Sequence, residues 1–323
     1  MKKIIIAIVS VLLVAYGSTD TKPEDHRVFF INSYHAGYKS SDDILEGFYK
    51  GMENKPVAVE VFYMNTKQID SSATAEKARE AVQHIEKFQP DIVVVSDDNA
   101  VKFVVEPFLT EKSYPVLFTG VNWTSSQYNL PADKVSGILE VLPIGATVDT
   151  IQNYFPPFKT VAVLSEASTS EQKNIEVITP ILKEKGLEVK YELVNDYESW
   201  KDAFVRLNKT ADLIFVPTNG AIRNWKEDAA ADFVQQQIRV PVITCDDFMM
   251  RYAAFGLTKL PDEMGEWAAE QALKILAGTP VDDIPISQNK KSQAWINPSL
   301  ARQIGFTPGD DLQKTLITFK ANE

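Results

Sequence analysis

Short apolar runs alternate with amphipathic segments along most of the chain. Between the first runs, apolar residues such as Ile44, Leu45, Phe48 and Met52 recur at the spacing of a helix. We therefore expect strands at residues 28–31, 57–62, 92–95 and 116–119. The pattern then restarts and predicts a second series of strands at residues 161–164, 189–194, 213–216 and 242–244. Because these runs are apolar throughout, they are typical of parallel strands covered on both faces, and the chain is predicted to form two successive α/β units.

Further segments lie between and after the two units. An extended stretch at residues 135–142 follows the first unit. Near the end of the chain, residues 260–262 open another helix, and Gly278 is placed to end it. A strand at residues 294–297 follows. The chain is therefore predicted to return to helix and strand after the second unit is complete.

Composition narrows the class of protein. The chain has 323 residues, about two domains' worth, and is 45% hydrophobic and 24% charged, so it can bury full-sized cores. Its 33 Lys and Arg against 44 Asp and Glu give a net charge of −11, which argues against a nucleic-acid binder, because such proteins need a basic face. With one cysteine and three histidines, the chain offers neither an internal disulfide nor a Cys/His zinc pattern, and we expect no metal and no cofactor.

The N-terminus has the pattern of a secretory signal peptide. Lys2 and Lys3 precede a run at residues 4–15 with one polar position, and this run is too short to span a bilayer comfortably. A buried N-terminal helix is the alternative interpretation. The following residues resemble a bacterial lipoprotein signal, except that Tyr16 stands where the lipid-bearing cysteine would be. We therefore expect residues 1–17 to be cleaved, releasing a periplasmic or extracytoplasmic protein without a lipid anchor.

Polar and aromatic residues follow six of the predicted strands. Ligands of open α/β sheets bind outside the carboxyl ends of the strands, where these residues lie. Any one cluster is also explained by helix caps and turns, but six clusters on the same predicted edges favour a ligand cleft. The candidate binding residues are Ser33, Tyr34, His35, Tyr38, Ser96, Asp97, Asp98, Asn122, Trp123, Ser165, Glu166, Thr218, Asn219, Asp246, Asp247 and Phe248.

The residue types in this set indicate the chemistry of the ligand. The aromatic side chains could form apolar walls, although core packing would explain each of them equally well. The carboxylates can accept hydrogen bonds from ammonium or hydroxyl groups. Candidate cations or donors are fewer, and they are Arg223, His35, Lys39 and Asn219. An acid-rich cleft with aromatic walls predicts a small zwitterion or an amine as ligand.

Two segments carry a resemblance to a known family. Residues 32–38 (NSYHAGY), with residues 41–47 (SDDILEG) behind them, are similar to the opening of bacterial ABC-transporter substrate-binding proteins of the tryptophan/tyrosine-type group. Residues 260–278 look like the returning helix of type I periplasmic binding proteins. The resemblance extends over residues 28–297 and implies an aromatic amino acid as ligand. The cysteine that anchors many transporter-bound members is missing here.

The resemblance also implies a fold. It is an α/β fold of two Rossmann-like lobes with parallel sheets, placed on either side of a cleft and joined by three crossover strands. Mapped onto this sequence, the first lobe takes residues 27–140 plus 260–283, and the second takes 141–259 plus 284–323. The crossovers would fall near residues 139–142, 256–259 and 284–286.

The sequence favours a binding protein over an enzyme. It contains no nucleophile elbow, phosphate-binding loop, dinucleotide-binding glycine pattern, zinc-protease motif or EF-hand. The two Asp-Asp pairs would suit hydrolysis by paired carboxylates, but adjacent side chains usually point apart. Two functions stay open: a solute receptor that delivers its ligand to an ABC permease, and a sensory protein that contacts a membrane kinase or chemoreceptor. For either, we expect a monomer that binds a small molecule and no nucleic acid.

Overall fold

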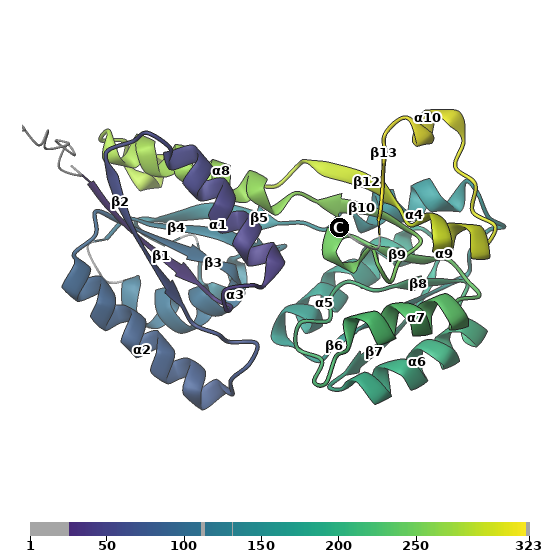
Figure 1. Ribbon diagram of the computed structural model, residues 1–323. Helices are drawn as coiled ribbons and strands as arrows, with labels where there is room; N and C mark the ends of the chain where they lie inside the picture. The colour runs from purple at the N-terminus through teal and green to yellow at the C-terminus, as the bar shows by residue number, and fades with distance from the viewer. Residues whose placement is uncertain (1–25, 111–113, 131, 321–323) are drawn as a thin grey trace, which may run out of the picture.

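Two lobes, each built on its own β-sheet, make up the protein (Figure 1). The computed structural model describes residues 26–110, 114–130 and 132–320. The predicted signal peptide at residues 1–17 lies outside them. The predicted fold class, an α/β protein with two mainly parallel sheets, is confirmed.

The first lobe has a six-stranded sheet in the order β11-β5-β4-β3-β1-β2, and all its neighbouring strands pair in parallel. Its strands are β1 (His26–Asn32), β2 (Val57–Tyr63), β3 (Ile92–Ser96), β4 (Val116–Asn122), β5 (Val135–Glu140) and β11 (Ser287–Gln288). Its helices are α1 (Lys39–Met52), α2 (Ser71–Phe88), α3 (Asp97–Ala100), α8 (Pro261–Leu276), the π-helix η1 (Val101–Leu109) and the 3₁₀ turns η2 (Ser126–Tyr128) and η4 (Val281–Asp283).

Alternating side chains of the central strand β1 build two cores in this lobe. Val28 and Phe30 pack with the apolar faces of α1 and α8, which lie side by side in Figure 1. Phe29 and Ile31 pack on the opposite face of the sheet with α2 and η1. Helices α1 and α8 approach closely, since a Cβ on Gly265 would lie 1.9 Å from the Ile44 carbonyl oxygen. Both faces of the sheet are therefore covered, as its continuous apolar strands predict.

The second lobe has a seven-stranded sheet in the order β13-β12-β10-β9-β8-β6-β7, parallel except where β12 runs against β10. Its strands are β6 (Thr160–Glu166), β7 (Glu188–Val194), β8 (Leu213–Phe215), β9 (Val242–Thr244), β10 (Phe255–Lys259), β12 (Ser292–Ile296) and β13 (Leu316–Thr318). Its helices are α4 (Ile144–Gln152), α5 (Thr169–Glu184), α6 (Tyr197–Thr210), α7 (Glu227–Gln237), the 3₁₀ turn η3 (Asp247–Met249), α9 (Pro298–Gln303) and α10 (Asp310–Gln313).

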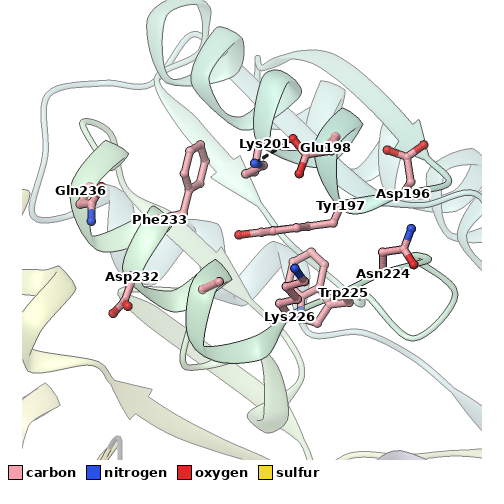
Figure 2. Close-up of a pocket in the computed structure, with 11 residues that line it drawn as sticks. Asp196, Tyr197, Glu198, Lys201, Asn224, Trp225, Lys226, Asp232, Phe233 and Gln236 are labelled. Carbon is pink, nitrogen blue, oxygen red and sulfur yellow. Dashed lines mark ion pairs between the residues drawn. The ribbon is translucent and has the colours of Figure 1, made fainter.

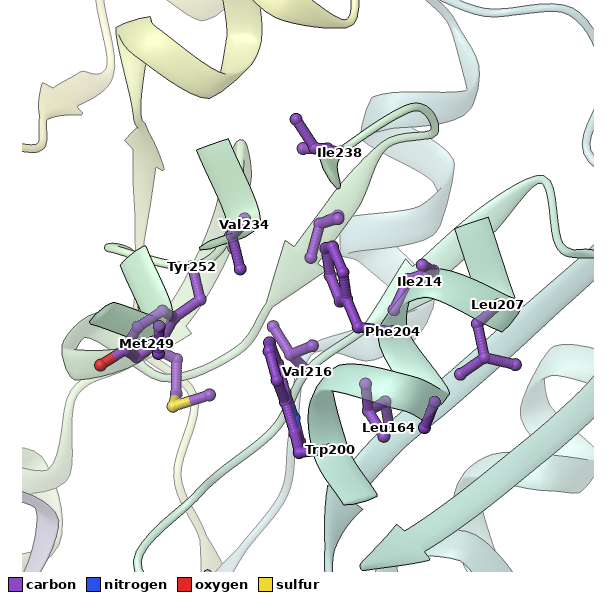
Figure 3. Close-up of a cluster of buried hydrophobic side chains, with 14 of the residues drawn as sticks. Leu164, Trp200, Phe204, Leu207, Ile214, Val216, Val234, Ile238, Met249 and Tyr252 are labelled. Carbon is purple, nitrogen blue, oxygen red and sulfur yellow. The ribbon is translucent and has the colours of Figure 1, made fainter. Parts of the chain in front are cut away.

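Large side chains of α6 dominate one of the two cores of this lobe (Figure 3). Trp200 stacks on Phe204 with 5.1 Å between the ring centroids, and both side chains are fully buried. Val216, Val234 of α7 and Met249 belong to the same cluster. The other face of the sheet packs against α4, α5 and α9. The second lobe therefore has a hydrophobic core on each face of its sheet.

The chain passes between the lobes three times. It crosses after β5, again between β10 and α8, and finally between β11 and β12. The last passage comes later than residues 284–286, where we expected it. Ser287 and Gln288 pair with Ile138 and Leu139 of β5, so the chain still belongs to the first sheet at this point.

Candidate functional site

The lobes face one another with the carboxyl ends of their strands, and a small cavity lies between them. Its volume is about 30 Å³, which is the space of roughly one water molecule. An open groove of about 700 Å³ lies alongside and shares Tyr34, Lys67 and Ser170 with the cavity. The cavity is lined by Tyr34, Tyr38, Ser40, Lys67, Asp97, Asn122, Glu140, Leu142, Ser170, Glu171, Asn174, Thr218, Asp246 and Lys259.

Asp97 brings a buried carboxylate to this cavity. It directly follows β3, and its backbone adopts the left-handed conformation with φ of 77°. One of its carboxylate oxygens accepts a hydrogen bond from the Asp98 backbone N–H at 2.6 Å. Burial, followed by the neighbouring charge of Asp98, raises the pKa of Asp97 to about 6. A buried carboxylate in this position would be stabilised by a cationic group of a ligand.

Two tyrosines form an aromatic wall next to Asp97. The rings of Tyr34 and Tyr38 meet edge to face, with 4.8 Å between their centroids. The Tyr38 hydroxyl lies 3.1 Å from Oγ1 of Thr218, which belongs to the second lobe. Burial raises the pKa of Tyr38 to about 12. The phenol therefore stays neutral near pH 7 and acts as a hydrogen-bonding group across the lobes.

Three buried lysines join the lobes through ion pairs. Lys67 Nζ lies 2.5 Å from Glu166 Oε1, and Lys173 Nζ lies 2.9 Å from Asp98 Oδ1. Lys259 Nζ lies 2.5 Å from Glu140 Oε1 and 3.0 Å from Asp246 Oδ1. The three lysine side chains are only 5–7% exposed. The site therefore contains both carboxylates and ammonium groups, whereas the sequence predicts mainly carboxylates.

These lysines were not among the predicted site residues, although the sequence contains a signal for two of them, Lys67 and Lys259. Glu140 and Lys259 are the last residues of β5 and β10. Lys67 comes four residues after the end of β2. Ligands of such sheets bind at the carboxyl ends of the strands. Applied to β5, β10 and β2, this rule indicates Glu140, Lys259 and the loop that carries Lys67. Lys173 lies inside α5, and no local pattern distinguishes it.

The predicted serines lie behind the cavity and do not line it. The Ser33 hydroxyl donates to the Ser96 carbonyl at 2.6 Å and accepts the Ala100 N–H at 2.8 Å. The Ser165 hydroxyl donates to Glu171 Oε2 at 2.7 Å. Ser96 is itself fully buried in β3. Ser33 therefore fixes the backbone after β3, Ser165 positions the Glu171 carboxylate, and none of the three serines lines the cavity.

Other predicted residues connect the lobes or shape loops. Trp123 donates from Nε1 to Asn174 Oδ1 at 2.8 Å and packs against the core of the second lobe. Asp247 pairs with Lys39 at 3.3 Å, where both side chains are partly exposed. Three further residues lie outside the cavity. Phe248 packs against the core of the second lobe, and the backbone carbonyl of Asn219 accepts the Ile222 N–H in a turn. His35 Nε2 lies 3.1 Å from Gln68 Nε2.

Half of the predicted cleft residues lie at the cavity or directly behind it. Those that line the cavity are Tyr34, Tyr38, Asp97, Asn122, Thr218 and Asp246. Asp98 and Glu166 lie directly behind it, where each is covered by a lysine from the opposite lobe. Of the two Asp-Asp pairs, the first member of each faces the cavity and the second points away, as expected for adjacent residues.

Glu171, which also lines the cavity, is a strong source of pH dependence. Its carboxylate is buried and accepts hydrogen bonds from Ser165 and Asn174. Burial, together with the nearby charge of Glu166, raises its pKa from the ordinary 4.5 to about 7. Between these two values the folded protein binds the proton more tightly than the unfolded chain does. This residue therefore contributes stability that is present below about pH 4.5 and is lost as the pH rises through about 7.

We expect Glu171→Gln to become more stable relative to wild type as the pH rises from 5 to 8, because the amide has no charge to bury. Urea unfolding at several pH values measures this difference. Glu176→Gln, at an exposed position of the same helix, is the matched control and should follow wild type. Parallel curves for wild type and Glu171→Gln would contradict the assignment.

A larger surface groove, of about 870 Å³, lies on the second lobe away from the interlobe cavity (Figure 2). It lies between α6 and α7, and its aromatic residues are Tyr197, Trp225 and Phe233. Trp225 donates from Nε1 to the Tyr252 hydroxyl at 3.0 Å and is thereby fixed to the core. Lys201, at the rim, pairs with Glu198 at 2.8 Å. Since all its lining residues come from one lobe, this groove would not respond directly to lobe movement.

Comparison with known proteins places this architecture in a family. A model of the family described as ABC transporter substrate binding protein matches residues 36–318. The chain belongs to this family. As a substrate-binding protein of an ABC transporter, it is of a class that acts outside the cytoplasm. Among residues 26–110, 114–130 and 132–320, no helix has the length and apolar character needed to cross a membrane.

One curated relative is similar to this chain in sequence, and two solved structures are similar to it in fold. A tyrosine-binding protein of Clostridioides difficile is 21% identical over 288 residues, which cover 86% of this substrate-binding protein and 79% of the relative. The ABC domain from Streptococcus pneumonia in complex with L-Trp superposes with a TM-score of 0.73 at 17% identity, covering 90% of this chain and 99% of that one. The ligand-free, open structure of a substrate-binding protein with adhesive properties from Clostridium difficile gives 0.69 at 14% identity, covering 91% and 99%.

Proposed function

We propose that this substrate-binding protein captures a small zwitterion, an aromatic amino acid, between its lobes and delivers it to an ABC importer. The observation that carries the proposal is the buried Asp97 carboxylate beside the rings of Tyr34 and Tyr38. The carboxylate is suited to an ammonium group and the rings to an apolar side chain. The names of two relatives, one tyrosine-binding and one in complex with L-Trp, support the same ligand class.

Capture requires the lobes to separate and close again. A cavity of about 30 Å³ is far too small for an aromatic amino acid. The three passages of chain after β5, β10 and β11 are the natural hinges for such a movement. We propose that cleavage of residues 1–17 releases the protein from the membrane. We also propose that the importer recognises its closed, ligand-bound form.

Replacement of Asp97 tests this function. Loss of a charge-assisted hydrogen bond costs about 1.5–3 kcal/mol, so we expect Asp97→Asn to weaken binding of L-tyrosine or L-tryptophan by about 10- to 100-fold. Calorimetric titration measures the affinity. Asp247→Asn, whose carboxylate lies outside the cavity, is the matched control and should bind within about twofold of wild type.

A ligand analogue makes the test specific. The acid 3-(4-hydroxyphenyl)propionate matches tyrosine except for the missing ammonium group. It should bind weakly, and with equal affinity to wild type and to Asp97→Asn. If Asp97→Asn kept the wild-type affinity for the amino acid, Asp97 would not be the ammonium partner. If neither amino acid bound to wild type, the proposed ligand class would be wrong.

A further inference from the structure

Lys67 of the first lobe has contacts that a protein usually offers to a bound ammonium ion. Its Nζ lies 4.9 Å from the ring centroid of Tyr34 and 4.7 Å from that of Tyr38. The same atom lies 2.5 Å from Glu166 Oε1 in the second lobe. The Lys67 side chain is only 5% exposed. Two aromatic rings and a carboxylate form the set of partners that recognises organic cations.

The partners of Lys67 are held in place independently of it. Glu166 is fully buried at the end of β6, and its second oxygen accepts the Ala221 N–H at 2.6 Å. The Tyr38 ring is tightly fitted against the second lobe, because a Cβ on Gly220 would lie 2.5 Å from its Cε2 atom. The rings come from one lobe and the carboxylate from the other, so a cation between them joins the two lobes.

We propose that Tyr34, Tyr38 and Glu166 form a subsite for an organic ammonium group, which Lys67 fills as a built-in occupant that holds the lobes together. This subsite lies in the cleft of the proposed function, and it depends on that function in no other respect. Lys67 thereby has a role in specificity, because a free amine must displace a cation that is tethered to the chain beside the subsite. The ammonium group of a transported amino acid therefore binds Asp97 and not Glu166.

Removal of Lys67 should vacate this subsite. In Lys67→Ala, Glu166 would be buried without a cation, and separation of the lobes would restore its hydration. We therefore expect a larger radius of gyration than that of wild type by small-angle X-ray scattering, both measured without added ligand. Added n-butylammonium chloride should restore the wild-type radius and raise the melting temperature of Lys67→Ala by roughly 2–4 °C at ten times its dissociation constant.

Matched probes and variants define the controls. Wild type should show no such shift with n-butylammonium, and n-butanol or sodium chloride should not restore Lys67→Ala. Lys39→Ala removes another lysine that bridges the lobes, but one that is 48% exposed, and it should keep the wild-type radius. Lys67→Ala combined with Glu166→Gln should lose the response to n-butylammonium, because the subsite then lacks its carboxylate.

Three results would overturn the proposal: an unchanged radius in Lys67→Ala, equal shifts with n-butylammonium in wild type and variant, or rescue that persists without Glu166. If Lys67→Ala does not fold, Glu166→Gln becomes the deciding variant, since it keeps Lys67 and must still enlarge the radius. No amino acid enters these measurements. A failed amino-acid titration and a failed amine rescue are therefore separate outcomes.

Discussion

Lys259→Met is expected to lower the free energy of unfolding at pH 7 by about 3–5 kcal/mol, the usual cost of breaking a buried ion pair by removing one partner. Lys259 lies between Glu140 and Asp246, and its side chain is 6% exposed. Met fills a similar volume, so the loss reports on charge rather than packing. The two carboxylates would then face each other in a buried site without a cation.

The pH dependence of this variant follows from the same contacts. Burial raises the pKa of Glu140 to about 7 even with Lys259 beside it. Without the lysine, the folded protein binds protons on these carboxylates still more tightly than the unfolded chain does. The stability of Lys259→Met should therefore fall more steeply than that of wild type as the pH rises from 5 to 8.

Urea unfolding measures both effects. Lys50→Met is the matched control, because Lys50 also pairs with a carboxylate at 2.5 Å but is 67% exposed, and it should change the stability little. Addition of Glu140→Gln to Lys259→Met should recover a large share of the loss. If Lys259→Met and Lys50→Met had the same free energy of unfolding, burial would not strengthen the ion pairs of Lys259 with Glu140 and Asp246.

Asp98→Asn should have an effect of similar size in the first lobe. The Asp98 carboxylate accepts hydrogen bonds from Tyr128 at 2.7 Å, from Asn122 Nδ2 at 2.5 Å and from Lys173 at 2.9 Å. The amide of Asn has an NH₂ group that cannot accept a hydrogen bond, and this group would face one or more of the same three donors. It would also leave the Lys173 charge buried and unpaired, so we expect a loss of about 3–5 kcal/mol in the free energy of unfolding.

A double-mutant cycle with Lys173→Met isolates the contact between the lobes. The two substitutions together should cost less than the sum of the single losses, by roughly 1–3 kcal/mol. Asp247→Asn again serves as control, since its partner Lys39 is 48% exposed. Additive losses in Asp98→Asn and Lys173→Met would mean that the pair does not couple the lobes.

The α/β fold class could be predicted from the sequence because its signal is local. Continuous apolar strands such as Ile92–Ser96 predict parallel sheets, and the polar residues that follow them mark the cleft edge. The boundary near residue 284 was misplaced because β11 has only two residues, Ser287 and Gln288, and neither is apolar. A strand this short and polar has no pattern of its own, and it forms only because β5 lies beside it.

The internal arrangement of the site was harder to predict because it depends on contacts between distant segments. Sequence spacing does not tell which of Asp97 and Asp98 faces the cleft. The left-handed backbone at Asp97 decides it, and this conformation is uncommon for any residue other than glycine. Lys173 and its partner Asp98 are 75 positions apart, and they meet only when the lobes are in contact.

The return of the chain through α8 also determines when the first lobe can fold during synthesis. The apolar face of α1 is covered by a helix that ends at Leu276, more than 220 residues after α1 ends at Met52. Until the ribosome has produced α8, this face has no native partner, and the sheet also lacks its edge strand β11. The first lobe is therefore completed late, after the main elements of the second have been made. Contacts of such long sequence separation form slowly, so the packing of α1 against α8 is a late step in the folding of the chain.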